Sequence, residues 1–207
     1  MTLIEKYFPD LSTAKKENLH QLKEIYTFWN KKINVISRKD MDLFFERHVL
    51  HSLAISKLIV FNKADVLDIG TGGGFPGIPL SILFPESNFT LIDSIGKKIK
   101  VVNAVKQELN LSNVEAIKSR AENVSGSFDF IVSRAVTRLN KFLPWTKGKI
   151  KKRNNHTIEN GILYLKGGDI SNEINEVDLR KPPAIIPISN YFEESFFETK
   201  LIVHISI

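Results

Sequence analysis

The stretch of sequence that decides the fold is Val66-Leu67-Asp68-Ile69-Gly70-Thr71-Gly72-Gly73-Gly74-Phe75-Pro76-Gly77. Its short apolar run, residues 66–69, predicts a buried strand of a parallel sheet. The glycines that follow let the backbone adopt positive φ and let a ligand approach with no Cβ in the way. A strand that ends in such a loop and leads into a helix is where α/β sheets bind nucleotide-like cofactors.

The order of the glycines distinguishes among cofactors. A dinucleotide fingerprint requires G-x-G-x-x-G, and Phe75 stands at its third glycine position. A P-loop requires Gly-Lys-Ser/Thr at its end, and these residues do not follow. The remaining pattern, D-x-G-x-G-x-G from Asp68 to Gly74, resembles the first motif of class I S-adenosylmethionine (SAM) methyltransferases. An acid near the loop suits a cationic sulfonium better than a pyrophosphate.

A second acid supports a nucleotide-like ligand. Residues 89–93 form another apolar run that ends in Asp93, 23 residues after Gly70. An acid at about 20 residues from the loop accepts hydrogen bonds from ribose hydroxyls in nucleotide-binding α/β units. The alternative is that Asp93 caps the helix that follows, and the two roles are compatible.

Strands and helices alternate through the rest of the chain, which predicts a mostly parallel sheet covered on both faces. Residues 200–207 and, more weakly, 184–188 predict a strand pair at the sheet edge, with an antiparallel C-terminal strand. The other expected strands are 66–69, 89–93, 114–117, 129–132 and 161–165. Three helices are expected between them: one that begins at about residue 76, one over 97–109 and one near 138–146.

Two helices are predicted before the first strand. Ser12 is a plausible N-cap, and the apolar residues that follow at spacings of three and four mark one face of an amphipathic helix. A second helix is expected over residues 41–59. The prediction is an α/β fold of one compact domain, in which residues 1–62 form a helical appendage packed on a SAM-binding core, residues 63–207.

Composition narrows the chemistry. The 207-residue chain has no cysteine and a net charge of +6. Without cysteine it has no disulfide framework, no thiolate metal site and no thiolate of the kind that adds to pyrimidine rings. The positive charge suits a polyanionic partner, because Lys and Arg release counterions when they contact phosphates. We see no signal peptide or membrane-spanning run, and we expect a cytoplasmic monomer.

Several separated blocks, in the right order, resemble one family. They are residues 29–34 (Trp-Asn-Lys-Lys-Ile-Asn), 47–53 (Arg-His-Val-Leu-His-Ser-Leu), 68–80, 89–98, 119–122 (Ser-Arg-Ala-Glu) and 133–135 (Ser-Arg-Ala). On these blocks the chain resembles the small-subunit rRNA guanine-N7 methyltransferase G family, also called glucose-inhibited division protein B. The resemblance implies a Rossmann-like class I methyltransferase fold. It also implies methyl transfer from SAM to N7 of one guanine in 16S rRNA, offered as naked rRNA or as the small ribosomal subunit.

The resemblance also implies roles for particular residues. Asp93 is expected to hold the ribose, Ala121 and Glu122 to lie beside the adenine, and Arg134 to face the cofactor and the target base. The basic residues expected to serve RNA or the active site are Lys97, Arg120 and Lys166. The full set expected to bind SAM is Asp68, Gly70, Gly72, Gly74, Phe75, Asp93, Ser94, Ile95, Ala121, Glu122 and Arg134.

Methylation of guanine N7 needs no general base, because N7 carries a lone pair and no proton. SAM is an activated donor, so alignment of N7, the methyl carbon and the sulfur is most of the task. An arginine would face the positive charge that develops on the base, so Arg134 is expected to orient the reactants. The alternative is a buried ion pair between Arg134 and Asp129 or Glu122.

Three further features leave alternatives open. His48 and His51 lie three residues apart, but no third metal ligand is apparent, so we expect a helix-packing or RNA-facing pair and no metal. The segment 147–160 carries five Lys or Arg within residues 147–153, and it either contacts RNA phosphates or is a solvated insertion. The competing functions are a SAM-dependent enzyme of a small molecule or another RNA, a non-catalytic RNA-binding assembly factor and, more distantly, a dehydrogenase.

Overall fold

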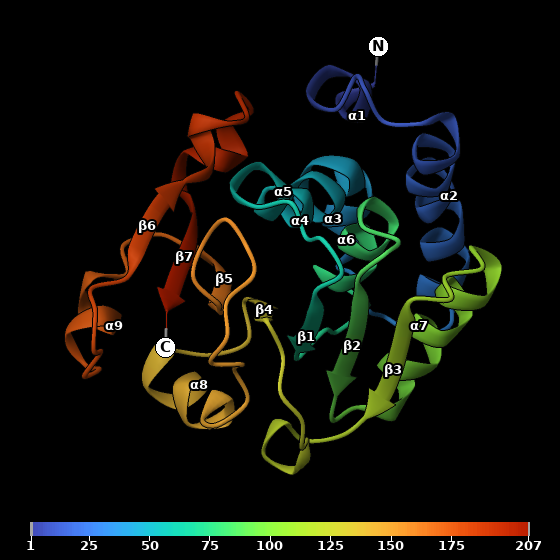
Figure 1. Cartoon of the computed structure of the whole chain (residues 1–207). Coiled ribbons are helices and arrows are strands. Elements are labelled where there is room, and N and C mark those ends of the chain that lie inside the picture. Colours follow the sequence, from blue (N-terminus) through green and yellow to red (C-terminus); the bar gives the residue numbers. More distant parts are fainter. Residues whose placement is uncertain (1, 207) are drawn as a thin grey trace.

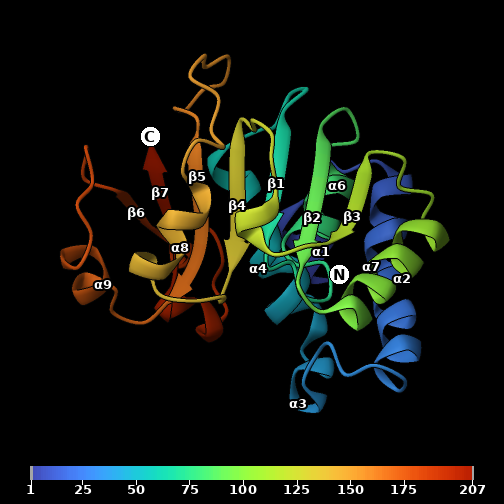
Figure 2. The same ribbon diagram turned by 90° about the horizontal axis from the view of Figure 1, so that it is seen from below.

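The computed structural model describes residues 2–206, which form a seven-stranded sheet with helices on both faces (Figure 1). The strand order is β3-β2-β1-β4-β5-β7-β6, and Figure 2 shows the strands side by side in this order. β1 to β5 are parallel, and β7 runs antiparallel to both β5 and β6. The strands are β1 (Asp65–Ile69), β2 (Asn88–Asp93), β3 (Val114–Lys118), β4 (Phe130–Arg134), β5 (Gly161–Gly167), β6 (Ala184–Pro187) and β7 (Lys200–Ser206).

The predicted α/β fold with an antiparallel C-terminal strand is confirmed. Every strand expected from the apolar runs is present within a residue or two of its predicted bounds, because buried parallel strands are marked by continuous apolar runs between turns. The helices after β1 are α6 (Gly77–Leu83), α7 (Gly96–Glu108), α8 (Leu139–Thr146) and α9 (Ser171–Asn175), with short 3-10 turns η2 (Ala121–Asn123), η3 (Ile188–Asn190) and η4 (Ser195–Thr199).

The helices before β1 differ in part from the prediction. Ser12 caps α2 (Thr13–Asn30) as expected, since its hydroxyl accepts a hydrogen bond from Lys15 N. The segment expected as one helix over 41–59 is interrupted, and its centre is a π-helical turn. Its elements are α3 (Arg38–Met41), η1 (Phe45–Leu50), α4 (His51–Leu53) and α5 (Ile55–Leu58), and the chain opens with α1 (Leu3–Tyr7).

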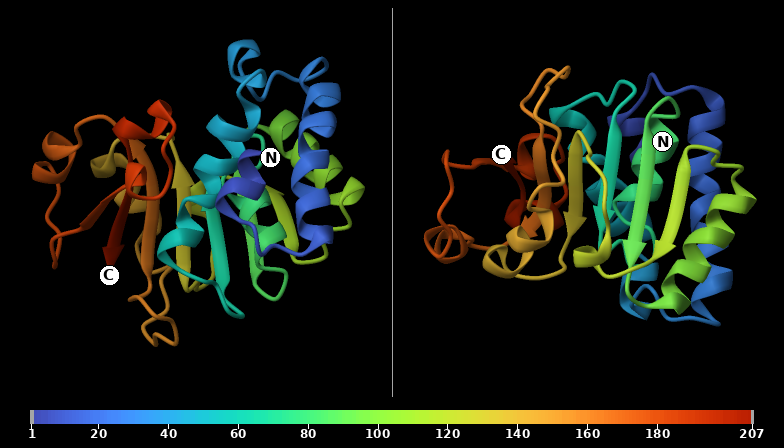
Figure 3. Two further views of the ribbon diagram at one scale, coloured as in Figure 1. Left: turned by 90° about the horizontal axis from the view of Figure 1, so that it is seen from above. Right: turned by 60° about the horizontal axis from the view of Figure 1, so that its bottom comes forward.

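Two hydrophobic clusters lie on opposite faces of the sheet. Val66 and Phe130 belong to the larger cluster, under the N-terminal helices, α6 and α7, whereas their neighbours Leu67 and Ile131 belong to the smaller one, under α8. The alternation follows from the two-residue period of a strand. A side chain at the end of a strand therefore points toward one layer of helices or the other, depending on its position in this alternation. Figure 3 shows both layers from two sides.

Candidate functional site

The loop between β1 and α6 is tied to a buried carboxylate. Asp68 is fully buried, and its Oδ2 accepts hydrogen bonds from Thr71 Oγ1 at 2.7 Å and from Gly77 N at 2.9 Å. Burial raises the pKa of Asp68 to about 7, against the opposing effect of these two hydrogen bonds. Asp68 therefore lies beneath the glycine loop and holds both ends of it.

Three glycines of this loop, Gly70, Gly72 and Gly74 (φ +104°), use the positive-φ conformation that glycine favours. Gly70 has φ +69° and Gly72 has φ +59°. A Cβ on Gly70 would lie 2.5 Å from Val136 Cγ2, so the loop packs closely against the chain that follows β4. A Cβ on Gly72 would meet nothing within 4 Å, so Gly72 borders open space.

Asp93, at the end of β2, joins this loop to the next one. Its Oδ2 accepts a hydrogen bond from Gly72 N at 3.0 Å, and its Oδ1 accepts one from Ile95 N at 2.8 Å. Lys98 Nζ lies 3.6 Å from the same carboxylate. The N-cap position of α7 is Ile95, so Asp93 holds the turn before the helix and is not its cap residue. Each carboxylate oxygen keeps a lone pair for a further donor.

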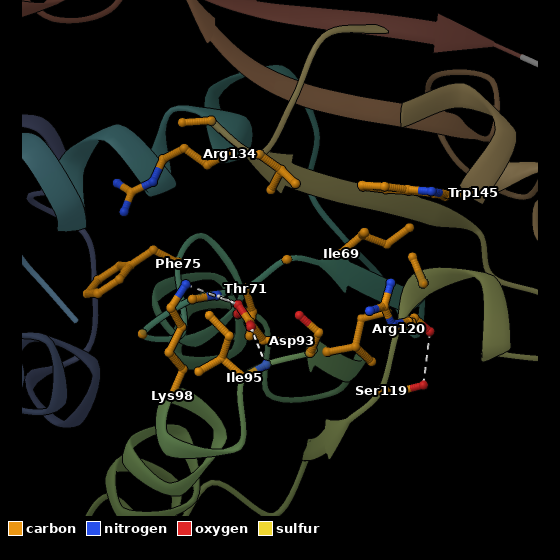
Figure 4. A pocket seen from close by; sticks show the side chains of 18 of the residues that line it. Ile69, Thr71, Phe75, Asp93, Ile95, Lys98, Ser119, Arg120, Arg134 and Trp145 are labelled. Carbon is orange, nitrogen blue, oxygen red and sulfur yellow. Dashed lines mark hydrogen bonds and ion pairs between the residues drawn. The ribbon is translucent and has the colours of Figure 1, made fainter. Parts of the chain in front are cut away.

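These loops enclose a cavity of about 510 Å³ at the carboxyl ends of β1, β2 and β4. In Figure 4, Trp145, Ser119 and Arg120 lie at one end, and Phe75, Arg134 and Lys98 lie toward the other. The predicted residues that line it are Gly70, Gly72, Phe75, Asp93, Ser94, Ile95, Arg120, Ala121, Glu122 and Arg134. The lining residues that sequence reasoning missed are Val35, Ile69, Thr71, Gly73, Ile92, Lys98, Ser119, Ala135, Val136 and Trp145.

Four predicted residues are not part of the cavity wall. They are Asp68, which lies beneath the loop, Gly74, Lys97 and Lys166. A Cβ on Gly74 would lie 2.7 Å from Ile78 Cγ1, so this glycine allows close packing within the protein. Lys97 is exposed on α7, one residue before the lysine that does line the cavity. Lys166 is 9% exposed, and its Nζ lies 2.7 Å from Glu173 Oε2.

Arg134 extends from the end of β4 toward the N-terminal helices. Its Nη1 donates to the carbonyl of Arg47 at 3.0 Å, and its Nη2 donates to His48 Nδ1 at 2.9 Å. The guanidinium carbon lies 5.0 Å from the centre of the Phe75 ring, a cation–π contact. Burial lowers the pKa of Arg134 to about 10, which leaves it a cation at neutral pH.

The alternative ion pair for Arg134 is wrong. Asp129 lies at the other end of β4, where its Oδ2 is 2.8 Å from Lys151 Nζ. Glu122 and Arg134 both line the cavity without forming an ion pair in residues 2–206.

Both histidines pack among aromatic rings, and His48 also accepts the hydrogen bond from Arg134. His48 stacks near Phe44 and Phe75, and burial together with Arg134 lowers its pKa to about 3. Because arginine only donates, His48 Nδ1 is the acceptor and the ring is neutral. His51 is buried against Phe196 and Phe197. Within residues 2–206, no group of three or more His, Cys, Asp or Glu side chains could hold a metal ion.

The basic segment 147–160 is held through Lys151 at the ends of the strands opposite to the cavity. Lys151 Nζ contacts Asp65 Oδ2 at 2.5 Å and Asp129 Oδ2 at 2.8 Å, and these acids stand at the amino ends of β1 and β4. The cavity is at the carboxyl ends of the same strands. Lys151 thus anchors the segment at the amino ends of the strands, opposite to the carboxyl ends that line the cavity.

The cavity fits SAM. Gly72 offers open space, Asp93 offers acceptor lone pairs for ribose hydroxyls, and Ile69, Ile95 and Ala121 offer apolar contacts for an adenine. A solved SAM-dependent methyltransferase from Aquifex aeolicus has the same fold, with a TM-score of 0.60 and 15% identity over 83% of this chain and 100% of that chain. Fold and site together define a class I SAM-dependent methyltransferase.

Comparison with known sequences makes the assignment specific. Residues 15–181 match the family described as rRNA small subunit methyltransferase G. A protein of that name from Flavobacterium psychrophilum is 55% identical over 100% of this chain and 98% of its own length. Its counterpart from Flavobacterium johnsoniae is 54% identical over 100% of this chain and 98% of its own length. The chain belongs to the rRNA small subunit methyltransferase G family, as its sequence blocks predicted.

Proposed function

We propose that this protein transfers the methyl group of SAM to N7 of one guanine in 16S rRNA, acting as a cytoplasmic monomer on rRNA or on the small ribosomal subunit. The observation that carries the proposal is the cavity at the carboxyl ends of β1, β2 and β4, lined by Gly72, Asp93 and Arg134, in a chain of this family. No helix in the described part of the chain has the length and apolar character needed to cross a membrane.

The chain's own residues bind and align the reactants. Asp68 and Thr71 hold the glycine loop, and Asp93 fixes Gly72 and Ile95. Asp93 would also accept hydrogen bonds from the ribose hydroxyls. Ala121 and Glu122 would lie beside the adenine. SAM, when bound, supplies the activated methyl group. Alignment of reactants can contribute about 7–11 kcal/mol to a reaction of this kind.

Arg134 is the residue that we place beside the target base. Two hydrogen bonds and the Phe75 ring fix its guanidinium, which lines the cavity. Guanine O6 and N7 are both acceptors, so the guanidinium can hold O6 while N7 stays open to the methyl group. A cation next to a base that becomes positive does not favour the charge, so its contribution is orientation.

The test is methyl transfer from labelled SAM to three substrates side by side. Small ribosomal subunits from cells that lack the protein, their naked 16S rRNA and free GTP are offered, and N7-methylguanine is mapped by specific strand cleavage. We expect label at one guanine in the rRNA or the subunit. No label in any sample, with SAM binding intact, would reject the function for these substrates and favour another RNA, a small molecule or a non-catalytic role.

A second test concerns Arg134. Arg134→Ala should lower methyl transfer at least tenfold while the SAM-binding loop remains folded. Thermal unfolding and SAM titration are the controls. Loss of activity that only parallels loss of folded protein would refute the orienting role.

A further inference from the structure

A second concave surface lies beside the cofactor cavity, between α2 and α7. Figures 1 and 3 show these helices next to one another at the β3 edge of the sheet. The groove has a volume of about 460 Å³, the size of a site for a small ligand or a single nucleotide. Its lining residues are Trp29, Gly96, Ile99, Lys100, Asn103, Ala104, Gln107 and Lys118.

The groove is basic. Lys100 and Lys118 line it, no acid does, and neither lysine forms an ion pair with any residue of the described chain. The Lys118 side chain lies along Gly96, where an added Cβ would be 3.2 Å from Lys118 Cδ. Glu108 lies beside this surface without lining it, and its Oε1 accepts a hydrogen bond from Trp29 Nε1 at 3.4 Å. Two unpaired cations in a groove without a lining acid are suited to an anionic ligand.

Two aromatic rings lie together on α2 beside the groove: Trp29 lines it, and Phe28, whose ring centre is 5.8 Å from that of Trp29, lines a neighbouring hollow. Trp29 forms one wall of the groove, and Lys32 Nζ lies 5.4 Å from its ring centre. The same ammonium lies 4.0 Å from the ring centre of Phe28, which is 52% exposed. Exposed rings next to lysines are the combination that binds unstacked bases and their phosphates.

The groove and the cofactor cavity are continuous along two chain segments. Gly96 lines the groove and its neighbour Ile95 lines the cavity, and in the same way Lys118 lines the groove and Ser119 the cavity. The groove therefore adjoins the cavity wall at Ile95 and Ser119, and RNA that flanks a base held at Arg134 can continue along that wall into the groove.

We propose that the α2–α7 groove binds the single-stranded RNA backbone that flanks the target guanine. Lys100 and Lys118 contact its phosphates, and Phe28 and Trp29 receive a neighbouring base. The inference rests on the proposed function, because it takes RNA as the substrate. The groove would extend the RNA-binding surface that we expect at Lys97, which is exposed on α7, and at Arg120, which is exposed and lines the cavity.

The experiment compares two double variants that change the net charge equally. Lys100→Glu/Lys118→Glu alters the groove, and Arg180→Glu/Lys181→Glu alters exposed residues just before β6, at the opposite edge of the sheet from β3. Affinity for naked 16S rRNA is measured by filter binding at several salt concentrations, together with SAM affinity and thermal unfolding. Lys100→Ala/Lys118→Ala provides a milder variant if the charge reversal disturbs folding.

We expect the groove variant to bind RNA at least tenfold more weakly, with SAM affinity unchanged. Its slope of log affinity against log salt should fall by about 1.4, since each phosphate contact to a single strand contributes about 0.7. The control should remain within twofold of the unmodified protein. Equal weakening of both variants, or normal binding by the groove variants, would overturn the proposal.

The same assay separates this inference from the proposed function. RNA binding is measured without methyl transfer. RNA binding that depends on the groove, without any methylation, would reject the proposed enzymatic function and support the groove as an RNA-binding surface. Methylation by the groove variants with an unchanged KM for RNA would reject the groove as a binding surface and support the enzymatic function.

Discussion

Gly72→Ala should weaken the affinity for SAM more than it lowers the stability of the fold. Gly72 adopts φ +59°, a conformation that costs a residue with a Cβ about 1–2 kcal/mol. The new methyl group meets no protein atom within 4 Å, so the cost to folding is confined to this backbone term. For a chain of this size, about 1 kcal/mol corresponds to a fall in Tm of about 2–4 °C.

The effect on SAM should be larger. Gly72 lines the cofactor cavity, so the added Cβ occupies space that SAM would fill. Overpacking by one methyl group costs about 1–3 kcal/mol, which weakens affinity by about 5-fold to 150-fold. The assay is isothermal titration of SAM or its demethylated product into each variant, alongside thermal unfolding.

Gly148→Ala is the matched control. Gly148 has φ +75° and an added Cβ would again meet nothing within 4 Å, but it lies outside the cavity wall. It should lose a similar Tm and keep its SAM affinity. If the two variants lose SAM affinity equally, or if Gly72→Ala binds SAM normally, the placement of SAM over Gly72 is refuted.

Three further predictions concern side chains in and around the cavity. Folding raises the pKa of Asp68 from 3.8 to about 7, so between these pH values the folded protein holds a proton that the unfolded chain has lost. The free energy of unfolding should therefore fall as the pH rises from about 4 to about 7, by up to about 4 kcal/mol. Urea unfolding at pH 5 and pH 8 should show a smaller fall for Asp68→Asn, and equal falls would contradict this reasoning. His48→Phe removes the hydrogen-bond acceptor of Arg134 and should lower kcat about tenfold or more. In an Arg134→Ala background the same change should have little further effect on kcat. Additive losses in this double-mutant cycle would show that His48 acts independently of Arg134. In a Trp29→Phe variant the remaining tryptophan is Trp145, which lines the cavity, so SAM should change the protein's fluorescence, and an unchanged spectrum would place the cofactor elsewhere.

Much of the candidate cofactor site is local in sequence, and the meeting of its residues in one cavity was predictable for that reason. The glycine loop and the turn at 120–122 come just after strands, and Asp93 is the last residue of one. The carboxyl ends of parallel strands meet on one side of a sheet, so these residues meet there too. Short apolar runs locate such strands, and glycines locate the turn that a ligand approaches. The sequence was therefore sufficient to bring these groups to one place.

Lining residues from distant elements carried no such signal. Val35 reaches the cavity from the loop after α2, where Asn30 Oδ1 accepts hydrogen bonds from Val35 N at 2.8 Å and Ile36 N at 3.0 Å. Trp145 reaches it from α8. Neither belongs to a strand-end motif, and their positions depend on how whole helices pack on the sheet.

The two basic residues at the ends of β4 and β5 show what tertiary structure alone decided. Arg134 lies on the face of Phe130 and Val132, so it meets His48, whereas Lys166 lies on the opposite face and is neutralised by Glu173. The sequence determined that both residues end buried strands, because local apolar runs define those strands. Only the assembled layers determined the partners of Arg134, since Arg47 and His48 lie 87 and 86 residues away in the chain and long-range packing brings them to the sheet. Glu173 lies only seven residues after Lys166, and it reaches that lysine because the chain turns back after β5 into α9.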